Sequence, residues 1–182
     1  MTQQSDLHIL ELIRTDNGRN YGFNLLVMKY REKVYWMVRR MVILHADADD
    51  VTQEVFIKVW KNIASYRGEA ALFTWIYRIA ANEALRHLQR KKAKAMLLMQ
   101  NFEGNFTNEL KAEVYTDANK QTKILQEALL TLPAKQKLVF NMRYYDELKY
   151  AEMSEILGTS VGALKASYHL AVKKIEEFVA KN

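Results

Sequence analysis

Aromatic and basic side chains gather between residues 66 and 94, where together they could bind single-stranded nucleic acid. Phe73, Trp75 and Tyr77 lie within five residues, and four lysines and arginines follow between residues 90 and 94. Bases stack on aromatic rings and phosphates pair with cations, so this combination is typical of such binding. In a helix, one face would carry Arg78, Asn82 and Arg86. The alternative is that the rings are core and the basic end complements the helix dipole.

A cluster of carboxylates precedes this stretch and could face a basic partner surface. Asp47, Asp49 and Asp50 suit the first turn of a helix, where the macrodipole favours negative charge. Asp50 and Glu54 would lie one turn apart on one face. The alternative is helix capping with a solvated face. A carboxylate-bridged metal pair is disfavoured, because no histidine follows a glutamate by three residues.

The clearest pattern is a helix-turn-helix between residues 149 and 174. Ser154 is small enough to let two helices cross closely, and Gly158 tolerates the positive φ of a tight turn. Ser160 is a good N-cap for the second helix, and Leu164 would return to the crossing. The second helix carries Lys165 and two further lysines, with no acid before residue 176, which suits contact with DNA phosphates. The alternative is an ordinary helical hairpin with a solvated lysine face.

Helices must position these side chains, because apolar residues recur with helical spacing along most of the chain. Helices are predicted over 7–14, 21–44, 48–63, 71–93, 120–131, 134–145, 149–157 and 161–179. Weak periodicity with asparagine, glycine and threonine predicts a linker over 94–121. We therefore expect an all-α protein with two small helical domains, at 1–93 and 122–182. The linker should be flexible, and the second domain should hold the helix-turn-helix.

The composition narrows the classes of function. The 182 residues include 27 Lys and Arg against 21 Asp and Glu, and the net charge of +6 permits a polyanionic partner. The absence of cysteine excludes disulfides and zinc–thiolate sites and fits a cytoplasmic location. No signal peptide and no run of eighteen apolar residues is visible, so membrane insertion is not expected. Neither an enzyme nor a cofactor is expected, because no phosphate loop, metal-ligand spacing or nucleophile–base pair is found.

The order of the motifs resembles a known family. The acidic Asp-Asp-Val-Thr-Gln-Glu-Val-Phe helix is followed by Tyr-Arg-Gly-Glu and then by Phe-Thr-Trp-Ile-Tyr-Arg-Ile-Ala-Ala-Asn. After the linker come Leu-Pro-Ala-Lys-Gln-Lys and the helix-turn-helix. Over about residues 22–93 and 120–178 this arrangement is similar to small bacterial sigma factors of the extracytoplasmic-function (ECF) type. The resemblance implies a factor that binds core RNA polymerase and promoter DNA, commonly under the control of an anti-sigma factor.

The resemblance also implies three sets of site residues. In the family the acidic helix docks on the clamp helices of the largest polymerase subunit, which points to Asp49, Asp50, Gln53, Glu54 and Phe56. The next loop and helix open and read the −10 element, with a flipped base facing Asn82, which points to Tyr66, Arg67, Trp75, Tyr77, Arg78, Asn82 and Arg86. The second helix of the C-terminal motif reads the −35 duplex, which points to Ser160, Ala163, Lys165, Ala166, Ser167, His169 and Lys173.

One other class of function stays open from the residues themselves. A free-standing helix-turn-helix regulator would use the N-terminal unit as a sensor or for dimerisation. Such regulators often bind as dimers to half-sites one helical turn apart. A comparison of oligomeric state with and without core polymerase separates that class from a sigma factor.

Overall fold

The chain is helical throughout the part that the computed structural model describes, residues 5–42, 44–99 and 120–181. The N-terminal half consists of α1 (Asp6–Arg14), α2 (Arg19–Val42), α3 (His45–Asn62), the short 3-10 helix η1 (Ile63–Ser65) and α4 (Leu72–Met99). The C-terminal half consists of α6 (Lys120–Thr131), α7 (Ala134–Tyr144), α8 (Tyr150–Leu157) and α9 (Val161–Val179). The all-α prediction is confirmed. None of the described helices is long and apolar enough to cross a bilayer.

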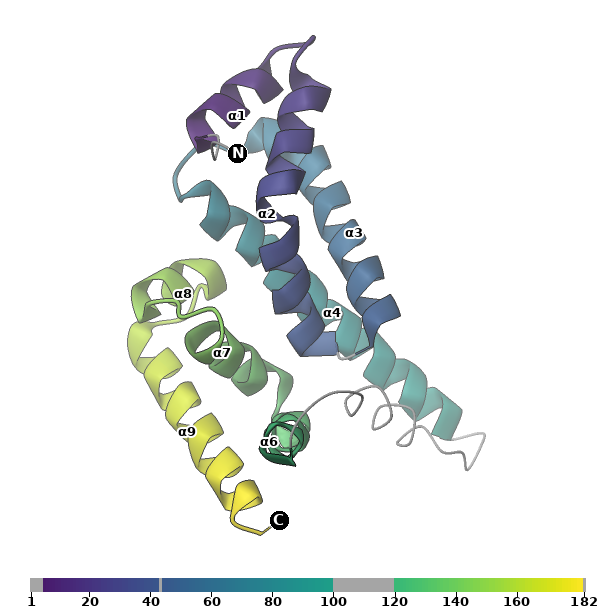
Figure 1. The fold of residues 1–182 in the computed structure, drawn as a ribbon, viewed down its shortest axis with the longest axis vertical. Coiled ribbons are helices and arrows are strands. Elements are labelled where there is room, and N and C mark those ends of the chain that lie inside the picture. The colour runs from purple at the N-terminus through teal and green to yellow at the C-terminus, as the bar shows by residue number, and fades with distance from the viewer. Residues whose placement is uncertain (1–4, 43, 100–119, 182) are drawn as a thin grey trace.

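Helix α2 is the centre of the N-terminal half, and α1, α3 and α4 pack around it (Figure 1). The apolar rows that predicted these helices are the residues that become buried. On α2 they are Val34, Met37, Val38 and Met41, all without exposed surface. The rows on α3 and α4 supply Val51, Val55, Val59, Ile76, Ala80 and Ala84. Each large side chain among them contributes about 1.5–3 kcal/mol by leaving water, so this packing fixes the angles between the helices.

The helix-turn-helix forms as predicted. Gly158 ends α8 in the left-handed conformation at φ 61°, where a side chain would be strained. The Ser160 side chain then caps α9 by accepting a hydrogen bond from the Ala163 backbone N–H at 3.3 Å. Leu164 is 1% exposed and lies in the shared core with Met153 of α8. The two helices of the motif are therefore held at a fixed crossing.

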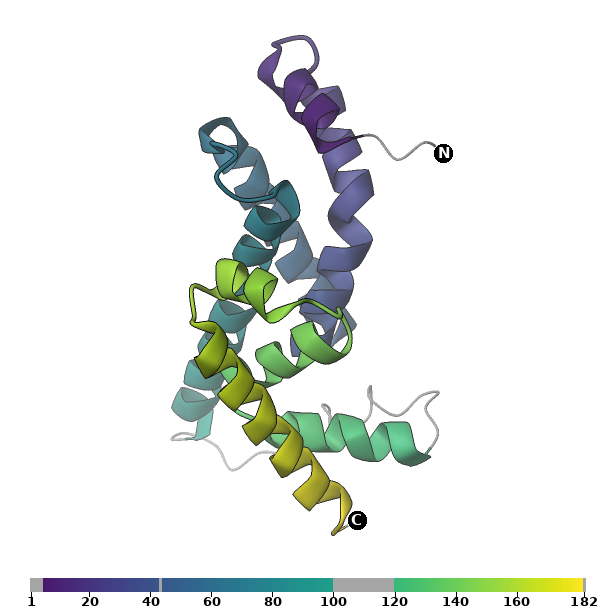
Figure 2. The ribbon, with the colours of Figure 1, turned by 90° about the vertical axis from the view of Figure 1, so that its left-hand side faces the viewer.

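The two halves lie against each other in this structure. Figures 1 and 2 show α7 and α8 beside α2 and α4, and these helices are in contact. Leu138, Met142, Met153 and Ile156 of the C-terminal half belong to the same buried cluster as the core of the N-terminal half. A smaller cluster joins α6, α7 and α9 alone. The predicted pair of helical units is present, and an apolar contact joins them.

Helix α4 continues further than the sequence pattern indicated. Its predicted end was residue 93, whereas the helix runs to Met99. The added residues are Lys94, Ala95, Met96, Leu97, Leu98 and Met99, and alanine, leucine, methionine and lysine all favour helix. The first part of the predicted linker is therefore helical. Residues 100–119 of that linker lie outside the described residues.

Candidate nucleic-acid and polymerase surfaces

The acidic first turns of α3 form an exposed surface. Asp49, Asp50 and Gln53 are all exposed, and neither aspartate has an ion-pair partner among the described residues. Their carboxylates add to the negative charge that a helix N-terminus favours. We call these three residues the acidic surface. It presents uncompensated negative charge, which attracts a basic partner and repels DNA phosphates.

Glu54 differs from the acidic surface because it faces α4. Its carboxylate pairs with Arg90 at 3.1 Å, and both side chains are about half exposed. An exposed pair of this kind contributes little stability, typically below about 1 kcal/mol. Glu54 is therefore engaged within the chain by a contact that a stronger partner can displace.

Further ion pairs join α3 to α4 beside the pair of Glu54 with Arg90. Asp47 pairs with Lys91 at 2.5 Å and lies 3.4 Å from the His87 ring nitrogen. Nearer the other end of α3, Lys58 pairs with Glu83 at 2.5 Å. Glu83 is almost completely buried. Sequence reasoning missed it, because a glutamate between Asn82 and Ala84 on a helix carries no sign that the helix face will be covered.

Phe56 is a correction to the predicted polymerase site. Its side chain is 8% exposed and belongs to the core of the N-terminal half. Phe56 follows Asp49 by seven residues and Gln53 by three, so it lies where the acidic side of α3 meets the covered side, and its ring packs into the core. A large ring in this position stabilises the fold, and its truncation would cost about 3–5 kcal/mol. Phe56 is therefore structural here.

The loop before α4 is closed by one tyrosine. The Tyr66 hydroxyl donates to the Ala70 carbonyl at 2.5 Å, and Gly68 between them has φ 77°. Burial, with a smaller contribution from the Asp6 carboxylate, raises the pKa of Tyr66. The Tyr66 ring also lies 5.3 Å from the Trp75 ring. These two contacts of Tyr66 hold the loop in place and leave Arg67 exposed at its turn.

Tyr77 is the second correction. Its ring is 2% exposed, and its hydroxyl donates to the Lys33 carbonyl of α2 at 3.2 Å. Burial raises the pKa of Tyr77 above its ordinary value, with a smaller contribution from Asp146. The Phe73 ring lies against it in a tilted arrangement, with 4.1 Å between the ring centroids. Trp75 is half-buried, as are Tyr66 and Phe73, so its ring remains partly accessible to a base.

Arg78, Asn82 and Arg86 lie on one exposed face of α4, as their spacing predicted. The Asn82 side chain has no hydrogen-bond partner among the described residues. Arg78 donates to the Glu155 backbone carbonyl of α8, and Arg86 donates to Glu83 at 2.5 Å. The amide of Asn82 is therefore open to a ligand, whereas one arginine is held by the C-terminal half.

The second helix of the helix-turn-helix, α9, presents most of the residues predicted to read duplex DNA. Six of the seven are exposed, namely Ser160, Ala163, Lys165, Ala166, His169 and Lys173, and Ser167 is half-buried. The Lys165 ammonium lies 5.8 Å from the Tyr150 ring centroid. Lys174 is exposed but donates to Gln136 at 2.9 Å. The first half of α9 is therefore a surface of small and basic side chains.

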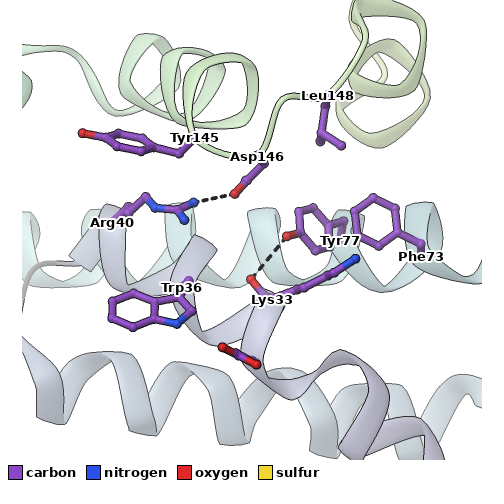
Figure 3. Close-up of a pocket in the computed structure, with 9 residues that line it drawn as sticks. Lys33, Trp36, Arg40, Phe73, Tyr77, Tyr145, Asp146 and Leu148 are labelled. Carbon is purple, nitrogen blue, oxygen red and sulfur yellow. Dashed lines mark hydrogen bonds and ion pairs between the residues drawn. The ribbon is translucent and has the colours of Figure 1, made fainter. Parts of the chain in front are cut away.

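Polar contacts cross between the two halves, and sequence reasoning found none of them. Arg40 of α2 pairs with Asp146, which follows α7 (Figure 3). The buried Lys137 ammonium donates to the Met41 carbonyl at 3.2 Å, and the Asn141 amide donates to the Arg40 carbonyl at 3.4 Å. These contacts join side chains about a hundred residues apart, so no local pattern could have indicated them.

A pocket of about 590 Å³ lies beside these contacts. Figure 3 shows side chains of α2 and α4 on one side and the segment after α7 on the other. Burial raises the pKa of Asp146, against the opposing influence of Arg40. Among the described residues, no group of three or more His, Asp or Glu side chains could hold a metal ion. The lining residues are Glu32, Lys33, Trp36, Arg40, Phe73, Tyr77, Tyr145, Asp146 and Leu148.

Comparison with known proteins matches both halves separately. The family described as Sigma-70 region 2 matches residues 26–94, and the family described as Sigma-70, region 4 matches residues 122–175. The chain is 32% identical to the ECF RNA polymerase sigma-E factor of Haemophilus influenzae, over 96% of this chain and 95% of that protein. It is 31% identical to the ECF RNA polymerase sigma-E factor of Escherichia coli K12, over 91% of each chain.

Two solved structures share the fold. The sigma factor RpoE of Bartonella quintana, solved in complex with the anti-sigma factor NepR, superposes with a TM-score of 0.69. It is 17% identical, and the match covers 87% of this chain and 96% of that one. CnrH, solved in complex with the cytosolic domain of CnrY, superposes with a TM-score of 0.68. It is 18% identical, with 97% of this chain and 99% of that one covered.

Proposed function

The chain belongs to the sigma-70 family as an ECF-type sigma factor, which directs RNA polymerase in the initiation of transcription, and we propose which of its surfaces performs each part of that work. Sigma factors are initiation factors without an enzymatic activity of their own. We assign polymerase binding and the −10 element to residues 1–93 and the −35 element to residues 122–182. The separate family matches to the two halves support this division.

We assign core polymerase binding to the acidic surface on α3. Asp49 and Asp50 are exposed and carry charge that no described residue neutralises, and this observation carries the proposal. Glu54 joins the contact when a cation on the polymerase replaces Arg90, since the existing pair is exposed and weak. The clamp helices of the largest subunit are the proposed partner.

We assign recognition and opening of the −10 element to the loop before α4 and to the exposed face of α4. Trp75 offers part of a ring for stacking, and Asn82 offers an amide that can both donate to and accept from a base edge. Arg67 and Arg86 supply positive charge for the displaced strand. Arg78 becomes available to DNA when the C-terminal half moves away from it.

We assign the −35 element to the N-terminal half of α9. A recognition helix places its first residues against base edges in the major groove, and those residues here include the exposed Ser160 and Ala163. Lys165 and Lys173 are exposed two turns apart on the same helix and suit phosphate contacts. The small side chains at positions 163 and 166 allow the helix to approach the groove closely.

We propose that an anti-sigma factor also binds this chain. The two solved structures with the same fold include a sigma factor bound to the anti-sigma factor NepR. We place the protein in the cytoplasm, because its proposed partners, core polymerase and chromosomal promoters, are there.

The polymerase assignment is tested by reversing charge on the acidic surface. Asp49→Lys with Asp50→Lys should weaken binding to core polymerase more than tenfold, because attraction to a basic surface becomes repulsion. Glu176→Lys with Glu177→Lys is the matched control, since it changes the net charge equally on exposed positions of α9. Binding is measured without DNA. Equal affinity of the two double variants would refute the assignment.

A further inference from the structure

Glu83 is a buried carboxylate that the assigned surfaces do not include. Its side chain is 4% exposed, and it lies on α4 next to Asn82. One of its oxygens pairs with Lys58 of α3 at 2.5 Å, and the other accepts a hydrogen bond from Arg86 at 2.5 Å. A carboxylate buried to this degree is costly unless cations compensate it, and here two cations do so.

The two cations play different parts. Lys58 comes from α3, so its pair with Glu83 ties the two helices together. Arg86 comes from α4 itself, one turn beyond Glu83, so its contact adds nothing to the joint between α3 and α4. The second contact instead restricts where the Arg86 guanidinium can lie.

Arg86 remains able to bind a ligand while Glu83 holds it. Its side chain is 53% exposed, and only Nη1 is engaged with Glu83. A guanidinium has five N–H donors, so most of them remain available to a phosphate. Arginine side chains lose considerable rotamer freedom on binding, and a side chain that is already fixed avoids part of that loss.

We propose that Glu83 is a positioning residue that fixes the Arg86 guanidinium on the DNA-facing side of α4 before promoter DNA arrives. Glu83 itself does not touch DNA. The inference rests on the proposed function, because it requires that Arg86 contacts the −10 region. Loss of the Glu83 contact should weaken promoter binding about three- to tenfold, which corresponds to one side chain left free.

The test is a double-mutant cycle in the complex with core polymerase. Glu83→Gln, Arg86→Ala and the double variant are compared for affinity to a promoter fragment with pre-unpaired −10 bases. Melting temperature is recorded for each. Glu83→Gln also leaves Lys58 uncompensated, so the same cycle is run in a Lys58→Met background. In that background the Glu83→Gln step removes only the negative charge that holds Arg86, because no ammonium at position 58 is left uncompensated.

The outcomes separate the two proposals. The inference predicts that Glu83→Gln weakens DNA binding three- to tenfold in both backgrounds and has less than a twofold effect once Arg86 is alanine. If Glu83→Gln weakens binding equally with and without Arg86, Glu83 acts through the fold and the inference is wrong. If Arg86→Ala weakens binding and Glu83→Gln does not, the inference is wrong while the DNA surface stands. If Arg86→Ala has no effect, the DNA assignment of Arg86 fails, and the inference fails with it.

Discussion

Arg40 and Asp146, 106 residues apart in the sequence, pair across the boundary where the two halves of the chain meet. The aspartate side chain is 9% exposed, and the arginine also lies over the Tyr145 ring at 4.8 Å. The same boundary holds Arg78 against the Glu155 carbonyl. We call the arrangement in which the two halves are in contact the closed form. In the closed form Arg78 is bound to the C-terminal half, although the proposed function assigns Arg78 to DNA. The stability of the contact between the halves should therefore affect promoter binding.

Arg40→Met should separate the two halves of the chain more often than Asp146→Asn does. Without Arg40 the nearly buried carboxylate is uncompensated, at a cost of about 2 kcal/mol or more. Asparagine at position 146 has nearly the same shape and no charge to bury. The measurement is fluorescence energy transfer between dyes on Lys61→Cys and Glu177→Cys, which are clean labelling sites because the chain has no cysteine. Glu32→Gln, another pocket residue, is the control.

The separation of the two halves should depend on pH, with the closed form favoured at lower pH. Burial raises the pKa of Asp146 in the folded chain, so the closed form binds a proton more readily than the open form does. Closure is therefore favoured as pH falls and is weakened as pH rises through the raised pKa. Arg40→Met removes the influence that lowers this pKa, so the variant should close again on acidification. A pH-independent Arg40→Met variant, or one no more open than Asp146→Asn, would contradict this account.

Lys137 should make stability rise with pH above neutrality. Burial, assisted by Arg39, lowers the pKa of Lys137 to about 8, whereas the unfolded value is 10.5. Between these values the unfolded chain binds more protons, so stability increases as pH rises. The full gain would be about 3 kcal/mol, of which part appears by pH 9. Urea unfolding at pH 7, 8 and 9 measures it.

Lys137→Met is the comparison for that series. The variant has no ammonium to bury, so its free energy of unfolding should stay flat from pH 7 to pH 9. Measurements stop at pH 9 because tyrosines titrate at higher pH. A wild-type chain as flat as the variant would show that Lys137 is not buried in solution as it is in the structure.

Lys165→Ala and Lys173→Ala should each reduce the salt dependence of binding to duplex DNA. Each lost phosphate contact changes the slope of log K against log salt by about 0.9, with no change in base preference. Lys181→Ala is the matched control, because Lys181 is exposed beyond the end of α9. Binding is measured between about 50 and 200 mM salt. Three variants with equal slopes would show that α9 does not lie against DNA.

Asn82→Ala should impair promoter opening without affecting the fold. The side chain is exposed, so the melting temperature should change little and the free energy of unfolding by no more than about 0.5 kcal/mol. Base preference at one −10 position should relax by about 1–3 kcal/mol, and pre-unpaired DNA should restore part of the activity. Asn24→Ala, on an exposed position of α2, is the control. Normal opening with unchanged preference would remove Asn82 from the site.

The sequence predicts the helices and the helix-turn-helix well, because each depends on nearby residues. Gly158, Ser160 and Leu164 act within a few positions of one another, and each does what its type indicates. Helical spacing also correctly groups Arg78, Asn82 and Arg86 on one face. Local patterns therefore account for most of the fold and for the exposed part of each candidate surface.

The two predicted site residues that are buried, Tyr77 and Phe56, lie on helices that pack against other helices on more than one side. Helix α4 packs against α2, α3, α7 and α8, so aromatic residues on two of its faces can become buried. Spacing shows that Trp75 and Tyr77 face differently but not that α2 covers Tyr77. Phe56 is buried for the same reason on α3. The contacts of Arg40 and Lys137 depend on how the halves pack, which no local pattern encodes.

The central claim is that this chain acts on promoters only as part of RNA polymerase, through separate surfaces for polymerase and DNA. The most direct measurement is run-off transcription from a promoter selected by sequencing the DNA bound by the chain with core polymerase. Wild-type chain should give transcripts from one start site, Asp49→Lys with Asp50→Lys should give none, and core alone should give none. Promoter binding by the chain without core, as tight as with it and unaffected by the double charge reversal, would contradict the account and indicate a free-standing regulator.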